Sequence, residues 1–129
     1  MGKVIGLGGV FIKSPDTAAL NAWYKRVLGV DVSDWGGAMF TAVPEGAVNL
    51  WTPFKADSDY FAPSTREVMI NFVVDDLDGV LALAKSEGVE PLKRDDSDPN
   101  GSFAWVMDPD GTKVELWQPK PGGEETSAA

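Results

Sequence analysis

A glutamate within an apolar run near the C-terminus is the strongest candidate for chemistry in this sequence. Glu115 lies in KVELWQP, where strand alternation places it on the same face as Trp117 and opposite Val114 and Leu116. A carboxylate in such surroundings must find hydrogen-bond donors or take up a proton. Glu115 is therefore a candidate general base, or a partner for a cationic or hydroxyl group of a ligand, and the alternative is a hydrogen-bonded residue without a role in function.

The residue types that are missing narrow the chemistry further. The 129 residues include no histidine and no cysteine, which excludes disulfides, thiol nucleophiles, zinc–thiolate sites and the usual general base at neutral pH. The net charge is −9, and the basic residues form no extended cluster, so no nucleic acid is expected as a partner. Because no apolar run is long enough for a membrane span and no signal peptide is recognisable, we expect a cytoplasmic protein with no membrane partner.

The stretch around Glu115 has a counterpart earlier in the chain. GTKVELWQP, residues 111–119, matches EGAVNLWTP, residues 45–53, and both carry Val-x-Leu-Trp before a proline. Asn49 takes the position of Glu115 in the earlier copy. Self-similarity at a fixed offset indicates a repeated structural unit.

Each half also begins with a strand-like segment that is followed by an amphipathic helix. In the first half, residues 4–13 are rich in Val and Ile, Ser14 is the expected N-cap before Pro15, and Gly29 ends the helix. The matching features of the second half are a strand over 67–74, a cap at Asp75 or Asp76, and Gly88. Each half therefore predicts the order β-α-β-β-β.

These observations predict an α+β fold made of two βαβββ modules. The modules cover about 4–53 and 67–119, joined by a linker over 54–66, within a single domain over 1–119. Residues 120–129 are expected to be a disordered tail. The further strands are expected in LGVDV, AMFTAV and AVNLWTP of the first half and EGVEP, SFAWVM and KVELWQP of the second, whereas RDDSDPNG is interpreted as a loop.

This order, together with DPDGTKVELWQP, VMINFVVDDLDGV and GGVFIKSPDTAALNAWYKRVLG, resembles the vicinal oxygen chelate superfamily. That superfamily includes glyoxalase I, bleomycin-resistance proteins and extradiol dioxygenases. The resemblance covers roughly residues 4–119. It implies curved mixed sheets with the helices on the convex side and a pocket on the concave side.

Strand alternation indicates which side chains face that pocket. The side chains expected against the helices are Val10, Ile12, Val48, Leu50, Ile70, Phe72, Val74, Ala104, Val106, Val114 and Leu116. The concave side then collects Phe11, Asn49, Trp51, Met69, Asn71, Phe103, Trp105 and Trp117 around Glu115. Such a surface favours a mainly apolar ligand pocket, and the alternative is a surface covered by another protein chain.

Metal-dependent members of the superfamily resemble one another in placing a ligand on the first and last strand of each module. Carried onto this sequence, the positions are Gly9, Asn49, Met69 and Glu115. Only Glu115 is a usual ligand, since glycine offers no side chain, methionine a soft thioether and asparagine a neutral oxygen. We therefore expect no metal site and no other cofactor.

The sequence thus predicts a metal-independent protein that binds a small, partly aromatic or cationic molecule in its concave pocket. One open alternative is a glyoxalase-like lyase or isomerase with Glu115 as general base and Asn71 or Tyr24 as helpers. Another is a dimerisation module without a ligand. Open sheet edges and the aromatic face favour a homodimer in either case.

Overall fold

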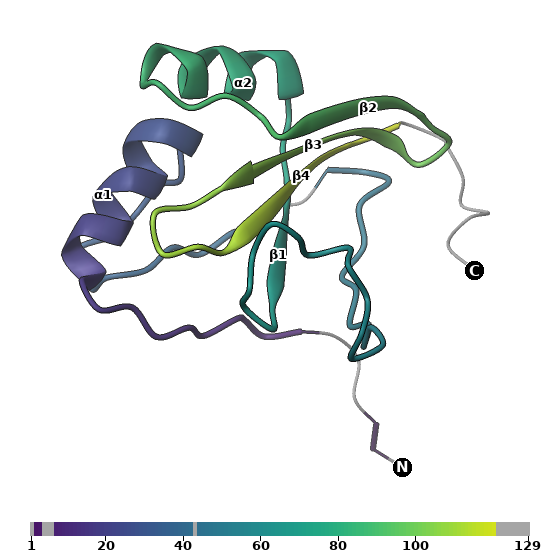
Figure 1. The fold of residues 1–129 in the computed structure, drawn as a ribbon, viewed down its shortest axis with the longest axis horizontal. Helices are drawn as coiled ribbons and strands as arrows, with labels where there is room; N and C mark the ends of the chain where they lie inside the picture. Colours follow the sequence, from purple (N-terminus) through teal and green to yellow (C-terminus); the bar gives the residue numbers. More distant parts are fainter. Residues whose placement is uncertain (1, 4–6, 43, 121–129) are drawn as a thin grey trace.

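The computed structural model describes residues 2–3, 7–42 and 44–120 of the chain. It contains two helices and one sheet: α1 (Thr17–Leu28), β1 (Met69–Val73), α2 (Leu77–Ser86), β2 (Lys93–Asp98), β3 (Gly101–Met107) and β4 (Lys113–Pro119) (Figure 1). The strand order is β1-β4-β3-β2, with β1 parallel to β4 and the other pairs antiparallel. The predicted α+β class with a mixed sheet is confirmed, while the predicted tail lies outside the described residues beyond Lys120.

The second half forms the whole of this sheet, in the β-α-β-β-β order that the sequence predicts. The central strand is β4, whose residues pair with β1 on one side and β3 on the other. Ala104, Val106, Val114 and Leu116 are almost fully buried on the face toward the helices. The predicted alternation of β3 and β4 is therefore confirmed.

Strand β2 corrects two predictions, because RDDSDPNG was expected to be a loop and the second strand of this half was expected at residues 87–91, which form no strand. Lys93 pairs with Trp105 and Asp95 with Phe103, and the register then shifts before Asp98. Aspartate has a low strand propensity, so the sequence of this segment does not indicate a strand. Pairing with the adjacent β3 stabilises it.

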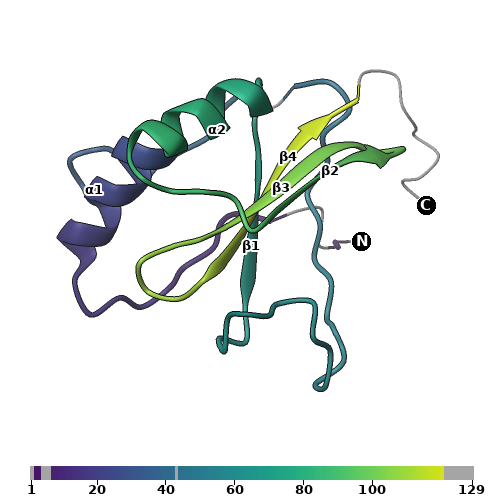
Figure 2. The same cartoon turned by 45° about the horizontal axis from the view of Figure 1, so that its top comes forward.

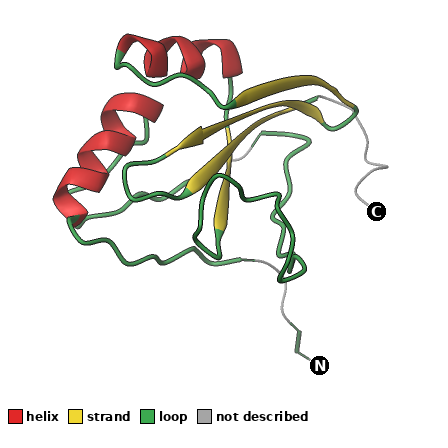
Figure 3. Ribbon diagram, viewed as in Figure 1, coloured by secondary structure: helices red, strands yellow, loops and turns green. Residues whose placement is uncertain are grey.

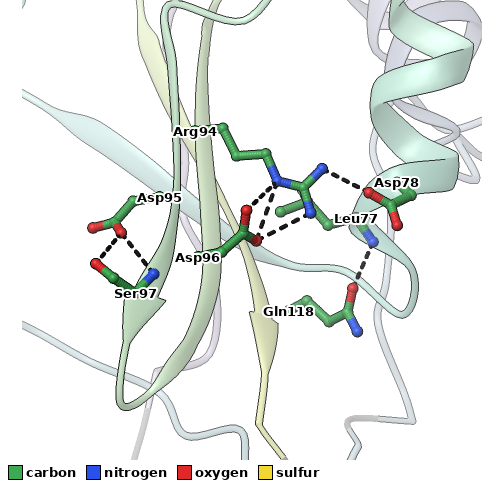
Figure 4. A network of polar contacts seen from close by, with 7 residues as sticks. All are labelled: Leu77, Asp78, Arg94, Asp95, Asp96, Ser97 and Gln118. Carbon is green, nitrogen blue, oxygen red and sulfur yellow. Dashed lines mark hydrogen bonds and ion pairs between the residues drawn. The ribbon is translucent and has the colours of Figure 1, made fainter.

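Alternate side chains of β2 point to opposite sides of the strand (Figure 4). Arg94 and Asp96 lie on the side of α2, where Nη1 of Arg94 binds Oδ1 of Asp78 at 2.6 Å. Asp95 lies on the other side, where its Oδ1 accepts from the Ser97 hydroxyl at 2.6 Å. Arg94 and Asp96 thus link β2 to Asp78 of α2, while Asp95 lies on the opposite face of the sheet.

The first half differs from its prediction, because α1 is its only regular element among residues 7–42 and 44–53. The described parts of the segments expected as strands, residues 7–13, 29–32, 38–42 and 47–53, run as loops, while residues 4–6 and 43 lie outside the described residues (Figure 3). Val10 and Leu50 are 62% and 67% exposed, Val48 is also exposed, and Ile12 is marginally so, although all four were expected against a helix. An apolar alternating pattern gives a strand only when a neighbouring strand pairs with its backbone, and these segments have none in the described structure.

Both helices form as the sequence predicts, with one correction at the first cap. Asp16, not Ser14, is the N-cap of α1, and its Oδ1 accepts from the Ala19 amide at 3.0 Å. Gly29 ends α1 in the left-handed conformation, with φ of 71°. Asp76 caps α2 in the same manner as Asp16 caps α1.

The two helices lie side by side on one face of the sheet (Figure 2). Their buried side chains, including Leu20, Val27 and Leu77, pack on the apolar face of β3 and β4. The opposite face of the sheet is free of helices and carries the polar and aromatic residues discussed below. Within the described ranges, neither helix has the length and apolar character that a membrane span requires.

Candidate functional site

Glu115 lies on the helix-free face of the sheet, between its two register partners Asn71 on β1 and Trp105 on β3. Its Oε2 accepts a hydrogen bond from Nδ2 of Asn71 at 2.7 Å, and its Oε1 accepts one from Nε1 of Trp105 at 3.0 Å. Glu115 is buried, with 9% of its surface exposed. Its neighbours on both sides thus supply the donors that the sequence requires of a carboxylate in this strand.

A third donor comes from the segment that the sequence indicates as a linker. The Tyr60 hydroxyl donates to Oε1 of Glu115 at 2.8 Å. Nζ of Lys113 donates to the main-chain oxygen of Tyr60 at 2.7 Å and lies 5.1 Å from the centroid of its ring. Burial, and then the hydrogen bond to Glu115, raise the pKa of Tyr60, so its hydroxyl keeps its proton well above neutral pH.

The end of this segment is anchored to the turn between β3 and β4. The Ser64 hydroxyl donates to the carbonyl oxygen of Gly111. The Arg66 guanidinium donates to Oγ1 of Thr112 at 3.0 Å and to the carbonyl oxygen of Lys13 at 3.3 Å. Tyr60 is therefore held in place over Glu115 by polar contacts at its own position and at the end of its segment.

A cavity of about 670 Å³ lies between this segment and the strands β2, β3 and β4. Its walls combine aromatic side chains, two lysines and four carboxylates: Asp59, Tyr60, Ala62, Pro63, Leu92, Lys93, Asp95, Asp98, Phe103, Trp105, Lys113 and Glu115. The ammonium groups of Lys93 and Lys113 lie 5.9 and 6.0 Å from the Trp105 ring centroid. The cavity therefore presents both positively and negatively charged groups to a ligand, close to aromatic side chains.

Three aromatic rings on this face lie nearly parallel. Phe103 is 6.0 Å from Trp105 and 6.1 Å from Trp117 between ring centroids, with interplanar angles of 15° and 8°. Nε1 of Trp117 donates to the carbonyl oxygen of Asn100 at 2.9 Å. Both indoles are buried and Phe103 is half-buried, so much of the aromatic surface is already covered by its own neighbours.

The structure brings together some of the predicted site residues. Phe103, Trp105 and Glu115 line the cavity, Asn71 binds Glu115, and Trp117 lies against Phe103. Met69 is on β1, opposite Lys113 rather than Glu115. Met69 therefore lies two residues along β1 from Asn71, which is the residue that pairs with Glu115.

Other predicted residues lie outside this cavity. Phe11 and Trp51 are 95% and 79% exposed, and Asn49 is exposed as well. Their segments form no strand in the described ranges, so nothing places them on the face of Glu115. Tyr24, considered as a helper of Glu115, belongs to the core under the helices, where its hydroxyl donates to Oδ2 of Asp108 at 2.6 Å.

Sequence reasoning missed most of the lining of the cavity, including Tyr60, Lys113 and the residues contributed by β2, and it also missed Arg66, which holds the segment of Tyr60. Strand parity puts Lys113 on the face of Glu115, two residues away, and this signal is readable in KVELW. For Tyr60 the signal is weaker: an Asp-rich and Pro-rich segment that also carries Phe54 and Phe61 has more aromatic surface than a solvated linker needs.

The four positions inferred for a metal do not form a ligand set. Asn49 is exposed, Met69 faces Lys113 in the register, and Gly9 has no side chain. Among the described residues no group of three or more His, Cys, Asp or Glu side chains could hold a metal ion. The two Glu115 oxygens already accept from three protein donors. The donor set therefore does not suit a metal ion.

Comparison with known protein families identifies the family to which this chain is similar. The model of the glyoxalase-like domain matches residues 9–117. No curated protein gives a match.

Solved structures of similar fold span almost the whole chain. One from the mobile metagenome of V. Pseudocholerae is 17% identical, with a TM-score of 0.57, covering 92% of this chain and 97% of its own. An integron cassette protein of V. Cholerae is 16% identical, with a TM-score of 0.57, covering 92% and 98%. A member of the glyoxalase/bleomycin resistance protein/dioxygenase superfamily from Sphaerobacter thermophilus is 25% identical, with a TM-score of 0.48, covering 90% and 98%.

The family match covers most of the chain, including both helices, β1, β2, β3 and the part of β4 that carries Glu115. The solved structures show the same fold at low identity. The chain therefore belongs to the glyoxalase-like domain family, within the vicinal oxygen chelate superfamily that its repeated pattern resembles.

Proposed function

We propose that this glyoxalase-like domain binds a small, partly aromatic molecule in the cavity beside Glu115, without a metal ion. The observation that carries the proposal is a cavity of about 670 Å³ in which Tyr60, Phe103 and Trp105 surround one buried carboxylate. Small-molecule sites have volumes of roughly 300–1,000 Å³ and combine aromatic walls with a few convergent polar groups. This cavity has both properties.

The charges around the cavity favour a ligand with cationic character. Its lining contains the carboxylates of Asp59, Asp95, Asp98 and Glu115 but only two ammonium groups. The Ser97 hydroxyl, and then the Ser97 amide, lower the pKa of Asp95, which keeps this carboxylate ionised at neutral pH. The net charge of −9 supports the approach of cations at low salt.

The position of Glu115 supports binding ahead of the lyase or isomerase alternative. A general base must present a lone pair to the proton that it removes. Three protein donors already occupy both oxygens of Glu115, two on Oε1 and one on Oε2, and leave at most one acceptor site on Oε2 for a substrate. We therefore assign Glu115 the role of an acceptor that orders the cavity.

Tryptophan fluorescence tests the proposal directly, because Trp105 lines the cavity. Aromatic amines, neutral aromatic isosteres and aromatic carboxylates of matched shape are titrated into the wild-type protein. We expect quenching by the amines, weaker quenching by the neutral compounds and the weakest by the carboxylates. Glu115→Gln should weaken the preference for amines, because one of the four lining carboxylates loses its charge, and should keep the affinity for neutral compounds within a few-fold. Equal response to all classes, or none, would contradict the proposal.

We also propose that the domain is a homodimer. The first half leaves apolar side chains such as Phe11, Leu50 and Trp51 largely exposed, and exposed apolar surface of this extent indicates an interface. A second copy offers the same open sheet edges and the same apolar segments. Light scattering at micromolar concentration should give twice the 13.8 kDa chain mass, and a value of one chain mass would argue against the dimer.

A further inference from the structure

The three donors to Glu115 differ in how firmly the fold holds them. Asn71 and Trp105 are its register partners on β1 and β3, and both strands are hydrogen-bonded to β4. Their backbones cannot move away from Glu115 while the sheet stays paired. Tyr60 belongs to a segment without helix or strand. Tyr60 is therefore the donor that can leave while the sheet remains intact.

The surroundings of Tyr60 are those of a bound phenol. Its hydroxyl lies 2.8 Å from Oε1 of Glu115, its ring is at 89° to the Trp105 ring with centroids 6.5 Å apart, and the Lys113 ammonium lies 5.1 Å from its centroid. Phe54 stacks on the ring at 5.5 Å and 16°. A carboxylate, an indole and an ammonium thus recognise the hydroxyl, the edge and the face of one phenol ring.

Tyr60 is also incompletely enclosed and borders the cavity. It remains 39% exposed, and its neighbours Asp59, Ala62 and Pro63 form the same wall. A movement of this segment away from β4 would enlarge the cavity and uncover Oε1 of Glu115. The segment would stay fastened at Ser64 and Arg66, whose bonds to the turn after β3 do not involve Tyr60.

Building on the proposed function, we propose that Tyr60 occupies the place of the ligand, and that the ligand is a hydroxylated aromatic molecule. Its hydroxyl replaces that of Tyr60 on Glu115, and its ring takes the position between Lys113 and Trp105. A neutral hydroxyl is a sufficient donor here because the acceptor is a carboxylate, and hydrogen bonds to charged groups are the stronger kind. Tyr60 then determines specificity, since a ligand must displace a tethered phenol to bind.

The test removes the tethered phenol and supplies a free one. Tyr60→Ala is titrated with para-cresol, which is the tyrosine side chain as a separate molecule, and with toluene, which lacks the hydroxyl. Binding is followed by tryptophan fluorescence, and circular dichroism confirms the fold. We expect para-cresol to bind Tyr60→Ala at least about tenfold more tightly than toluene, from one hydrogen bond to a charged group. It should also bind this variant more tightly than wild type, in which Tyr60 competes at an effective concentration on the order of millimolar.

Two further variants separate the hydroxyl from the ring. In Tyr60→Ala combined with Glu115→Gln, the preference for para-cresol over toluene should fall severalfold, because the acceptor loses its charge. In Tyr60→Phe the ring stays but its hydrogen bond to Glu115 is gone, so the affinity for para-cresol should lie between those of wild type and Tyr60→Ala. If Tyr60→Ala does not fold, Tyr60→Phe decides, and no gain over wild type then overturns the inference.

The outcomes distinguish this inference from the proposed function. Equal binding of para-cresol and toluene by folded Tyr60→Ala, or binding of neither, shows that Tyr60 does not occupy a ligand's place. The proposed function is judged on the wild-type protein with the larger aromatic compounds. Quenching there, with no preference in Tyr60→Ala, would overturn only the role of Tyr60.

Discussion

The two halves of the chain carry the same short pattern and use it in opposite ways. KVELW forms β4, the central strand of the sheet, whereas AVNLW forms no strand and is largely exposed. Leu116 is 1% exposed and its counterpart Leu50 is 67% exposed. Trp117 and Trp51 differ in the same direction.

The difference shows what an alternating apolar pattern does and does not specify. It specifies which side chains share a face if a strand forms. The strand itself depends on neighbours that satisfy its backbone, and β4 has one on each side. Helices satisfy their own backbone, which is why α1 forms in the first half although no strand adjoins it among residues 7–42 and 44–53.

The largest expected effect comes from truncating the matched leucines. Leu116→Ala should lower the free energy of unfolding by about 2–5 kcal/mol, because it leaves a cavity in the core under α2. Leu50→Ala should change it by less than about 0.5 kcal/mol in the isolated chain, as for an exposed side chain. Urea unfolding of both variants measures the contrast, at a protein concentration low enough to dissociate the proposed dimer, which would cover Leu50. Similar losses in both would mean that Leu50 is buried in solution, as a tight dimer requires.

A smaller loss of stability is expected when the hydrogen bond between Tyr24 of α1 and Asp108, in the turn before β4, is removed. The Tyr24 hydroxyl donates to buried Asp108, so Tyr24→Phe should lower the free energy of unfolding by about 1–3 kcal/mol by leaving a carboxylate oxygen without this donor. Equilibrium unfolding at neutral pH measures the change. Tyr60→Phe, which alters the more exposed tyrosine, is the matched control and should lose less.

The same residue gives a pH dependence with a definite sign. Burial, and then the hydrogen bond to Asp108, raise the pKa of Tyr24 above its unfolded value of 10.0. The folded state thus holds the proton more tightly, so this contribution to stability is complete below about pH 10 and is lost as the pH rises further. Unfolding measured from neutral to alkaline pH should show a decline that is less steep in Tyr24→Phe. An equal decline in both proteins would count against the assignment.

The helix caps should show equal effects in the two halves. Asp16 and Asp76 each accept from the backbone amide three residues further on. Asp16→Ala and Asp76→Ala should each lower the free energy of unfolding by roughly 1 kcal/mol, the usual value for a lost N-cap. Thermal unfolding of the two variants makes the comparison. A loss confined to Asp76→Ala would mean that α1 contributes little to the stability of the sheet.

The smallest expected effect is that of metal removal. Three of the four inferred ligand positions carry Gly, Asn and Met, so purified protein should contain well under one equivalent of Zn, Ni, Fe or Mn, and chelation should leave its unfolding midpoint unchanged. Elemental analysis before and after dialysis measures this. Stoichiometric metal that is lost in Glu115→Ala would refute the prediction.

The sequence by itself determined the features that depend on local periodicity. The alternation of β3 and β4, a cap of α2 at one of two adjacent aspartates and the end of α1 at Gly29 follow from residues close together in the chain, and the structure has them, with Asp76 as the cap. Glu115 was identified because a carboxylate interrupts an apolar strand. Its contacts with Asn71 and Trp105 follow from strand pairing.

Only the tertiary structure decided which strands find partners and what covers Glu115. The Asp-rich β2 forms because β3 lies beside it, and propensity alone argues against that strand. Tyr60 reaches Glu115 from a segment with no periodicity, 55 residues away along the chain. Such a contact depends on how the turn after β3 holds Ser64 and Arg66. Local patterns carry no information about packing between distant segments, and for this reason the donor above the carboxylate could not be predicted.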